Sequence, residues 1–168
     1  MRLSSEQRLI RDSVRRFAEE QLAPHAAQWD RDKAFPREAL RGLAELGLYG
    51  ACIPEEWGGA GLDHVSLALA LEEVAAGDGA CSTILSVNNA VVCTPILNNG
   101  TTEQKTRFLK PLATGDALGC FCLTEPHAGS DAAAIRTSAR RDGDAYVLNG
   151  VKQFITSGKN GDIAIVFA

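Results

Sequence analysis

The 168-residue sequence has few aromatic residues (6%), no run of lysine and arginine, and no repeated C-x-x-C pair. Its net charge of -4, without a basic cluster, argues against a nucleic-acid role, because binding to phosphate backbones requires clustered positive charge. The five cysteines are an odd number, which fits buried thiols in a reducing compartment better than a disulfide framework or a zinc site. Internal repeats and low-complexity segments are also absent, so we expect a compact globular chain.

Targeting and classical nucleotide motifs are missing as well. No window approaches the ~18 continuous apolar residues of a membrane helix, and Glu72 and Glu73 interrupt the most apolar helical stretch, residues 65–76. The N-terminus becomes charged at once and lacks the apolar core of a secretory signal. There is no Walker loop, and the glycines between Gly58 and Gly61 lack the G-x-G-x-x-G spacing. We therefore expect a soluble, intracellular protein without a classical dinucleotide fold.

The first two thirds of the sequence has helical periodicity. Ser4 followed by Gln7 predicts a capping box. One amphipathic stripe then consists of Ile10, Val14, Phe17 and Ala18. A second helix is predicted from Pro36 to about Leu46, and Gly47 is its stop signal.

Two nearly all-apolar helices follow, over residues 64–79 and 81–97, and this composition predicts a bundle interior. Thr101 with Gln104 predicts the start of a further short helix, which we expect to end at Pro111 and Gly115. Residues 1–116 are therefore predicted to form an N-terminal helical domain.

After about Ala117 the pattern changes to strands. Residues 117–124 are strand-like, and residues 134–168 resemble a meander with turn signals at 142–143, 149–150 and 157–161. The predicted fold class is α+β: an N-terminal all-helical bundle followed by an incomplete antiparallel β-barrel domain over residues 117–168. The sequence ends in the apolar run "IAIVFA", which would leave an unpaired strand edge. We therefore expect it to be a piece of a longer chain.

The stretch "LTEPHAGSD", residues 123–131, is a polar loop directly after the first predicted strand. We do not expect a catalytic triad of Ser130, His127 and Asp131, because triad members usually converge from separate segments. The histidines are too scattered for a metal site. Cys120 and Cys122 alternate along the strand, so they should point the same way and pack in the core.

Two interpretations of this loop remain. It is either a cradle for an anion and a heterocycle, or a polar turn in which Ser130 caps a local group. For a cradle, Gly129 would let the backbone approach a ligand closely, the amides and hydroxyl near Ser130 would donate to phosphate, and Thr124 would face a ring edge.

A second stretch, "VKQFITSG", favours the cradle. On a strand, Phe154 and Thr156 would face the same side of the sheet, which suits a flat heterocycle that needs stacking and a hydrogen bond. The alternative is a core phenylalanine and a surface threonine.

These motifs resemble those of the flavin-dependent acyl-CoA dehydrogenases. The resemblance rests on "CFCLTEPHAGSD" and "NGVKQFITSG" at the expected separation. Similar segments extend it over nearly the whole chain, namely residues 4–30, 35–50, 53–63 and 96–115. It implies an all-helical N-terminal domain, a middle β-barrel and a C-terminal four-helix bundle.

The resemblance also implies a cofactor, FAD, and its binding residues. These are Phe121, Cys122, Leu123, Thr124, Gly129, Ser130, Phe154, Ile155 and Thr156. It places the Phe154 ring against the flavin and the Thr156 hydroxyl near flavin N5. Many members have Trp where Phe154 stands, and Gly, Asp or Asn where His127 stands. Ser130 would also touch the acyl-CoA substrate, and the substrate-binding candidates on the helix are Ile84, Val87, Asn88 and Val91.

The implied reaction is α,β-dehydrogenation of an acyl-CoA thioester, with hydride transfer to flavin N5 and stabilisation of the enolate-like charge. No catalytic residue is expected in this stretch, because the base of the family is a glutamate that would lie beyond Ala168. The role expected for Glu125 is structural. We expect no metal, and we expect the 168 residues alone to be inactive and to bind FAD weakly.

The resemblance further implies an electron-transfer flavoprotein as electron acceptor, a role in fatty acid or amino acid catabolism, and a homo-oligomer, dimer or tetramer, at full length. It implies a location in the bacterial cytoplasm or, as a second choice, the mitochondrial matrix. Two alternatives stay open: a catalytically silent scaffold subunit that binds flavin and acyl-CoA, and an acyl-CoA oxidase that reoxidises its flavin with O₂.

Overall fold

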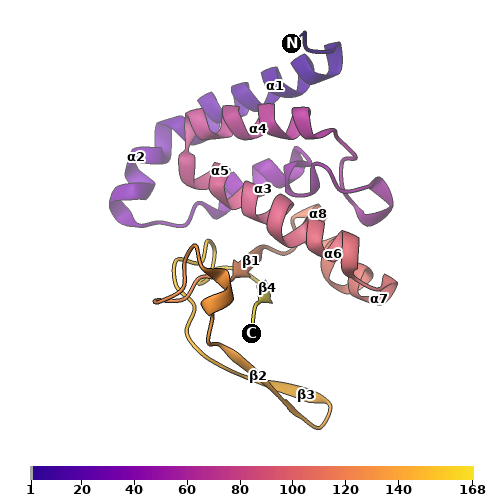
Figure 1. The fold of residues 1–168 in the computed structure, drawn as a ribbon. Coiled ribbons are helices and arrows are strands. Elements are labelled where there is room, and N and C mark those ends of the chain that lie inside the picture. Colours follow the sequence, from indigo (N-terminus) through magenta and orange to yellow (C-terminus); the bar gives the residue numbers. More distant parts are fainter. Residues whose placement is uncertain (1) are drawn as a thin grey trace.

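The computed structural model describes residues 2–168, with helices first and short strands second (Figure 1). The helices are α1 (Ser5–Phe17), α2 (Ala23–Asp32), α3 (Arg37–Glu45), α4 (His64–Gly77), α5 (Gly79–Ser86), α6 (Thr94–Asn99), α7 (Thr102–Gln104) and α8 (Lys110–Thr114). The strands are β1 (Gly119–Cys122), β2 (Ser138–Asp142), β3 (Ala145–Asn149) and β4 (Ile163–Val166). The predicted α+β class, with a small and open β part, is confirmed.

The helix starts follow the capping signals in the sequence. The Ser4 hydroxyl accepts from the Gln7 amide at 3.0 Å, and the Gln7 side chain accepts from the Ser4 amide at 3.1 Å. Thr101 and Gln104 form the same reciprocal pair at the start of α7. α3 begins directly after Pro36, and both capping boxes and this start confirm the prediction.

Prolines lie inside three of the helices instead of ending them. Of the predicted end at Pro111 and Gly115, the Pro111 part is wrong, because α8 continues through this residue to Thr114, and the Gly115 part is confirmed, because Gly115 is the left-handed C-cap. Ahead of each proline stands a π-helical turn, over Ala18–Leu22, Val87–Cys93 and Lys105–Leu109. In each case the residue just before the proline donates its amide to the carbonyl five residues back. The wider turn accommodates the missing proline N–H and the bulk of its ring, so the helix proceeds.

One continuous helix of 21 residues therefore runs from Gly79 to Asn99, and an 18-residue window within it has a mean hydropathy of 1.5. By length and composition alone it is apolar enough to cross a membrane, which the sequence patterns did not predict. Its buried side chains, which include Leu85 and Val92, pack in the two cores described next. We therefore describe it as the central helix of this fold.

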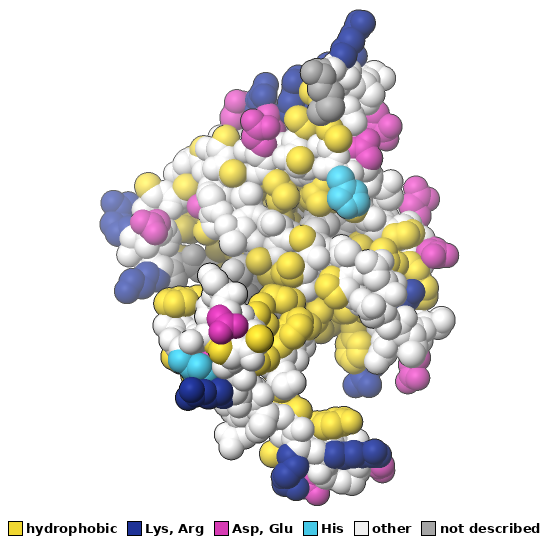
Figure 2. Space-filling model, in the orientation of Figure 1, with side chains coloured by type: hydrophobic (Ala, Val, Ile, Leu, Met, Phe, Trp, Pro, Cys, Tyr) yellow, Lys and Arg dark blue, Asp and Glu magenta, His cyan; other side chains and the backbone are white. Residues whose placement is uncertain are grey.

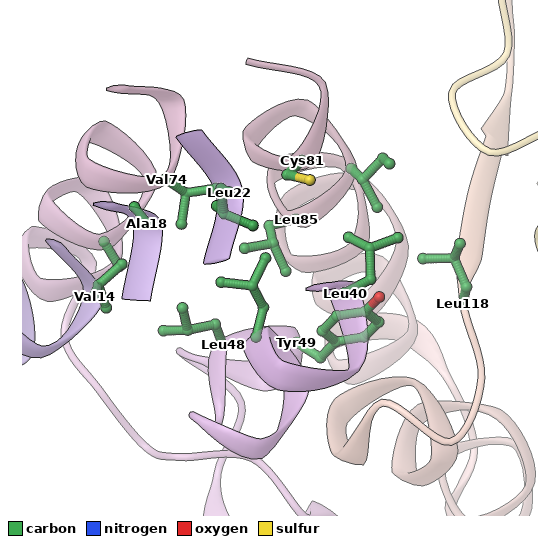
Figure 3. Packing of buried hydrophobic residues seen from close by; sticks show 13 residues of the cluster. Val14, Ala18, Leu22, Leu40, Leu48, Tyr49, Val74, Cys81, Leu85 and Leu118 are labelled. Atoms are coloured by element: carbon green, nitrogen blue, oxygen red, sulfur yellow. The ribbon is translucent and has the colours of Figure 1, made fainter. Parts of the chain in front are cut away.

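The buried side chains form two clusters. The first lies between α1, α3, α4 and α5, and Figure 3 shows Val14, Leu22, Val74 and Leu85 pointing toward one another within it. Leu118, just before β1, reaches this cluster from the β part. The second cluster consists of Ile53, Val92, Cys93, Leu109, Leu112 and Ala113, and half-buried side chains of β1 and β4 pack against it. Residues of the β part thus pack against both helical clusters.

The strand pairing differs from the predicted antiparallel meander. β1 pairs with β4 in parallel, with Gly119 opposite Ile163 and Cys122 opposite Val166. Only β2 and β3 form the expected antiparallel hairpin, in which Asp142 pairs with Ala145. Residues 149–150 do not form a hairpin turn, because the chain crosses over after β3 to reach β4, which pairs with β1 in parallel. The turn signals correctly marked the strand ends but did not specify the partners.

Asn88 joins the central helix to the first strand. Its amide nitrogen donates to the Tyr49 carbonyl at 2.9 Å and the Leu112 carbonyl at 3.2 Å, and its oxygen accepts from the Gly119 amide at 3.0 Å. A Cβ atom at Gly119 would lie 2.5 Å from Val92 Cγ1, so only glycine permits this close approach. These contacts fix the start of β1 against the helix.

The β2–β3 hairpin projects away from the helices (Figure 1), and its side chains are exposed. Figure 2 shows apolar side chains gathered in the hollow between the helical part and this hairpin. The large exposed apolar side chains of the β part are Tyr146, Val147, Leu148, Val151, Phe154, Val166 and Phe167. Apolar surface of this extent is typical of a surface that another chain segment, ligand or partner covers.

Candidate functional site

The segment that follows β1, residues 123–131, is named here the Thr124 loop. Its centre is a tight turn in which the Glu125 amide donates to the Ala128 carbonyl at 3.0 Å and the Ala128 amide donates back at 3.1 Å. Ala128 and Glu125 are buried, whereas Gly129, Ser130 and Asp131 are exposed. The loop is therefore fixed at its centre and open at its C-terminal end.

The Glu125 carboxylate holds this loop in place. Its side chain is only 2% exposed, and it accepts hydrogen bonds from the Arg136 amide at 2.7 Å, the Thr137 amide at 2.9 Å and the Lys152 ammonium at 2.8 Å. The Thr137 hydroxyl also donates to it. The Lys152 ammonium, followed by the Thr137 hydroxyl and the two amides, holds the pKa of this carboxyl well below its usual range. Glu125 is therefore a weak base with a structural position, as predicted.

The second stretch, residues 152–157, is named here the Thr156 segment, and it is not the predicted strand. Phe154 has a φ of 57° and Ser157 a φ of 61°, both in the left-handed region that such residues rarely adopt. This segment belongs to the crossover between β3 and β4, so the same-side argument for Phe154 and Thr156 from strand alternation is wrong. Phe154 is 85% exposed, so it is not a core residue either.

The two segments nevertheless lie side by side. The Gln153 amide donates to the Thr124 carbonyl at 2.8 Å, and the Lys152 ammonium donates to the Leu123 carbonyl at 3.0 Å. Residues 29 positions apart in the sequence are thus brought to one place at the end of β1.

Several polar groups at this place have no protein partner. Among residues 2–168, no hydrogen bond involves the side-chain hydroxyls of Thr124, Ser130 or Thr156. A Cβ atom at Gly129 would meet no atom within 4 Å, and Gly129 has no positive φ, so the protein itself does not require glycine there. A ligand that approaches the backbone closely would require it. This arrangement fits the cradle better than the locally capped turn.

One cavity, of about 480 Å³, places Thr156 opposite the central helix. Its lining includes Ile155 and Thr156 from the Thr156 segment and Thr83 and Ile84 from α5. Thr124, Ser130 and Phe154 are not among the residues that line it. The structure thus brings Ile84 to the cofactor candidates and leaves Ser130 on the neighbouring open loop.

The other helix candidates lie elsewhere. Val87 packs against the second core cluster, and Val91 is half-buried. Asn88 is fully buried and makes the backbone hydrogen bonds described above, so it faces the helix–strand junction and not the cavity. A substrate contact by Asn88 would require breaking this junction.

The β1 candidates Phe121 and Cys122 are half-buried and contact Phe167, which follows β4. The Phe121 ring packs edge-to-face against Phe167 at 5.0 Å between centroids, and the Cys122 carbonyl accepts from the Phe167 amide at 3.1 Å. Cys120 and Cys122 point the same way, as predicted, with their sulfurs 3.8 Å apart.

Sequence patterns missed the two residues that organise this place, Lys152 and Thr137. Lys152 is only 11% exposed, and Thr137 is buried against Glu125. The sequence places Glu125 in the Thr124 loop and Lys152 in the Thr156 segment. These two residues carry opposite charges, and their segments were expected to converge. That coincidence was the available signal.

Comparisons with known proteins agree with this architecture. The family model described as "Acyl-CoA dehydrogenase, N-terminal domain" matches residues 4–116, and "Acyl-CoA dehydrogenase, middle domain" matches residues 120–168. The mitochondrial short-chain specific acyl-CoA dehydrogenase of Rattus norvegicus is 44% identical over 160 residues, which are 95% of this chain and 39% of that protein. The chain therefore spans about two fifths of the length of this relative.

Solved structures show the same likeness. A chain in the structure described as the electron transferring flavoprotein of Acidaminococcus fermentans has a TM-score of 0.96 and 44% identity, over 100% of this chain and 44% of that one. A glutaryl-CoA dehydrogenase from Mycobacterium smegmatis in complex with FADH2 has a TM-score of 0.93 and 40% identity, over 99% of this chain and 43% of that one.

Proposed function

Because this chain belongs to the acyl-CoA dehydrogenase family, we propose that it binds FAD between the Thr124 loop and the Thr156 segment, in a protein that dehydrogenates an acyl-CoA thioester between Cα and Cβ. The observation that carries this proposal is the junction of the two segments through Gln153 and Lys152, beside three hydroxyls without protein partners. The FADH2 complex of the Mycobacterium smegmatis neighbour supports the choice of cofactor.

Each side chain of the cradle has a role that follows from its chemistry. The exposed Phe154 ring would lie against the flat ring system of the cofactor. The Thr156 and Thr124 hydroxyls would hydrogen-bond to its polar edge. The amides of Gly129 and Ser130, together with the Ser130 hydroxyl, would donate to phosphate oxygens. Bound flavin supplies hydride-accepting capacity, which no side chain offers.

The catalytic base is proposed to be a glutamate outside these 168 residues. Glu125 has its lone pairs occupied by protein donors and its pKa lowered by Lys152, so it is unsuited to removing a proton. Glu73 is 9% exposed and forms a two-point pair with Arg15, at 2.6 and 2.9 Å. Because the β part is small and open and the proposed base lies outside these residues, we expect the 168 residues alone to turn over no acyl-CoA and to bind FAD weakly.

The acyl chain of the substrate is proposed to enter the cavity next to Ile84. This side chain and Ile155 supply apolar surface beside Thr156, where the reacting carbons must meet the flavin. Val87 and Val91 remain candidates farther along the same helix. Asn88 is left out of this proposal because its side chain holds β1. Ser130 remains a candidate for contact with the CoA portion.

The test is an absorbance spectrum of the purified full-length protein, followed by anaerobic addition of a panel of acyl-CoA thioesters. The proposal expects a flavin spectrum that at least one thioester bleaches. Bound flavin that no thioester bleaches would support the silent scaffold subunit instead, and steady oxygen consumption on thioester addition would support an oxidase. A protein that binds no flavin would contradict all three.

The family membership also supports proposals for the electron acceptor, the assembly and the domain division of the protein. We propose an electron-transfer flavoprotein as electron acceptor and a dimer or tetramer as the assembly. We also propose a division at residues 116 and 117 between the helical and β domains. Cytoplasmic location in a bacterium, or location in the mitochondrial matrix, stays a prediction, since relatives occur in both settings.

A further inference from the structure

The ion pair between Glu125 and Lys152 connects three separate segments of the β part. Glu125 follows Thr124 directly, and Lys152 stands two residues before Phe154. The Lys152 ammonium lies 2.8 Å from the Glu125 carboxylate and 3.0 Å from the Leu123 carbonyl. The third segment enters through the Arg136 and Thr137 amides.

The Glu125–Lys152 pair is buried, so each charge depends on the other for its stabilisation. Side-chain exposure is 11% for Lys152 and 2% for Glu125, so neither charge is well solvated. A buried charge that loses its partner is strongly destabilised, which means that the two segments separate only at considerable cost. The nearest other titratable group is His127, whose Nε2 lies 3.4 Å from Glu125 and 3.2 Å from the Ala134 carbonyl.

Apart from local turn hydrogen bonds, which the Ile155 and Ser157 carbonyls accept from the Gly158, Asn160 and Gly161 amides, the Thr156 segment depends on contacts with the Thr124 loop. It lies between β3 and β4 and takes part in neither strand ladder. Its backbone includes two residues with positive φ, Phe154 and Ser157, and such conformations persist only when surrounding contacts impose them. The contacts toward the Thr124 loop are the Gln153 hydrogen bond and the Lys152 side chain.

We propose that Glu125 and Lys152 are positioning residues for the cofactor: their buried pair sets the spacing between the Thr124 loop and the Thr156 segment. Neither side chain needs to touch the flavin. The pair places the Thr124 and Thr156 hydroxyls and the Phe154 ring in register before the ligand arrives, which reduces the ordering cost of binding. This inference rests on the proposed function for its ligand but not for its effect on the free protein.

The test compares Lys152→Met with Lys152→Arg and with the matched control Lys110→Met, which alters an exposed lysine on α8. In the flavin-free protein, Lys152→Met should accelerate amide hydrogen exchange of residues 153–157 by about tenfold or more, and leave that of α4 and α5 unchanged. The FAD dissociation constant should rise by about tenfold or more, as expected for loss of a charge-assisted hydrogen bond. Lys152→Arg should restore much of both, and the control should match wild type.

Unchanged exchange at residues 153–157 together with an unchanged FAD dissociation constant in Lys152→Met would overturn the inference. If this variant does not fold, the double variant Glu125→Gln/Lys152→Met removes both buried charges and should fold. The inference then expects fast exchange and weak FAD binding in the double variant, and wild-type values would refute it. If the wild-type protein binds no FAD, the proposed function fails, and the exchange measurement still decides whether the pair positions the segment.

Discussion

Asn88→Ala should destabilise the protein by about 3 kcal/mol, because it removes three buried hydrogen bonds at about 1 kcal/mol each. The loss leaves the Tyr49 and Leu112 carbonyls and the Gly119 amide without partners in a fully buried position. Unpaired buried groups cost more than average bonds contribute, so about 5 kcal/mol is the upper end of the expectation.

The assay is urea unfolding of the purified protein, followed by circular dichroism. With a slope of about 2 kcal/mol/M, a loss of about 3 kcal/mol lowers the unfolding midpoint by about 1.5 M urea. Asn99→Ala is the matched control, since Asn99 is exposed and its side chain donates only to the Pro95 carbonyl, at 3.0 Å. The control should change stability by less than about 0.5 kcal/mol.

A change below about 1 kcal/mol in Asn88→Ala would refute the reasoning that Asn88 joins the helix to β1. A variant of wild-type stability with an altered preference for acyl chain length would go further. It would show that Asn88 faces substrate, as the sequence comparison within the family implied.

Two further predictions concern titration and thiol chemistry. Glu125 has a pKa below its ordinary value of 4.5 in the folded protein, so its stabilising effect is full above that pH and is lost as the pH falls toward the folded pKa. The stability difference between wild type and Glu125→Gln should thus stay constant from about pH 5 to 8 and shrink on acidification, and a difference that instead grows below about pH 4 would contradict this. In alkylation with iodoacetamide at pH 8, the half-buried Cys52 and Cys122 should react before Cys93, whose pKa burial raises to about 12. Mass spectrometry of partly labelled protein checks the order, and early labelling of Cys93 would show that its cluster opens.

Local signals in the sequence predicted the helical part well. The two capping boxes, the stripe through Val14 and the start after Pro36 all depend on residues within a few positions of each other. The end predicted at Pro111 failed because a π-helical turn absorbs the proline, and this adjustment depends on the packing of the whole helix.

Long-range pairing could not be predicted in the same way. The turn signals located β2 and β3 correctly, but nothing local indicates that β4 lies parallel to β1. The strand prediction for the Thr156 segment is wrong for the same reason. Phe154, Ile155 and Thr156 suit a strand by residue type, whereas the crossover to β4 and the buried Lys152 contact determine the actual path of the segment.

The sequence predicted which residues belong to the site but did not predict how they are arranged in space. Similarity to the family selected Thr124, Ser130 and Thr156, and the structure brings their two segments together while leaving Ser130 outside the cavity that contains Thr156. The structure also shows that Asn88 faces the junction with β1. Helical spacing alone cannot distinguish this orientation from one that faces a pocket.

The most direct test of the cradle is amide hydrogen exchange of the purified full-length protein with and without FAD. The account predicts slower exchange on FAD addition in two separate stretches, the Thr124 loop around residues 129–131 and the Thr156 segment around residues 154–157, with little change in α1 and α2. Protection in only one of these stretches, or in neither while FAD is demonstrably bound, would contradict it.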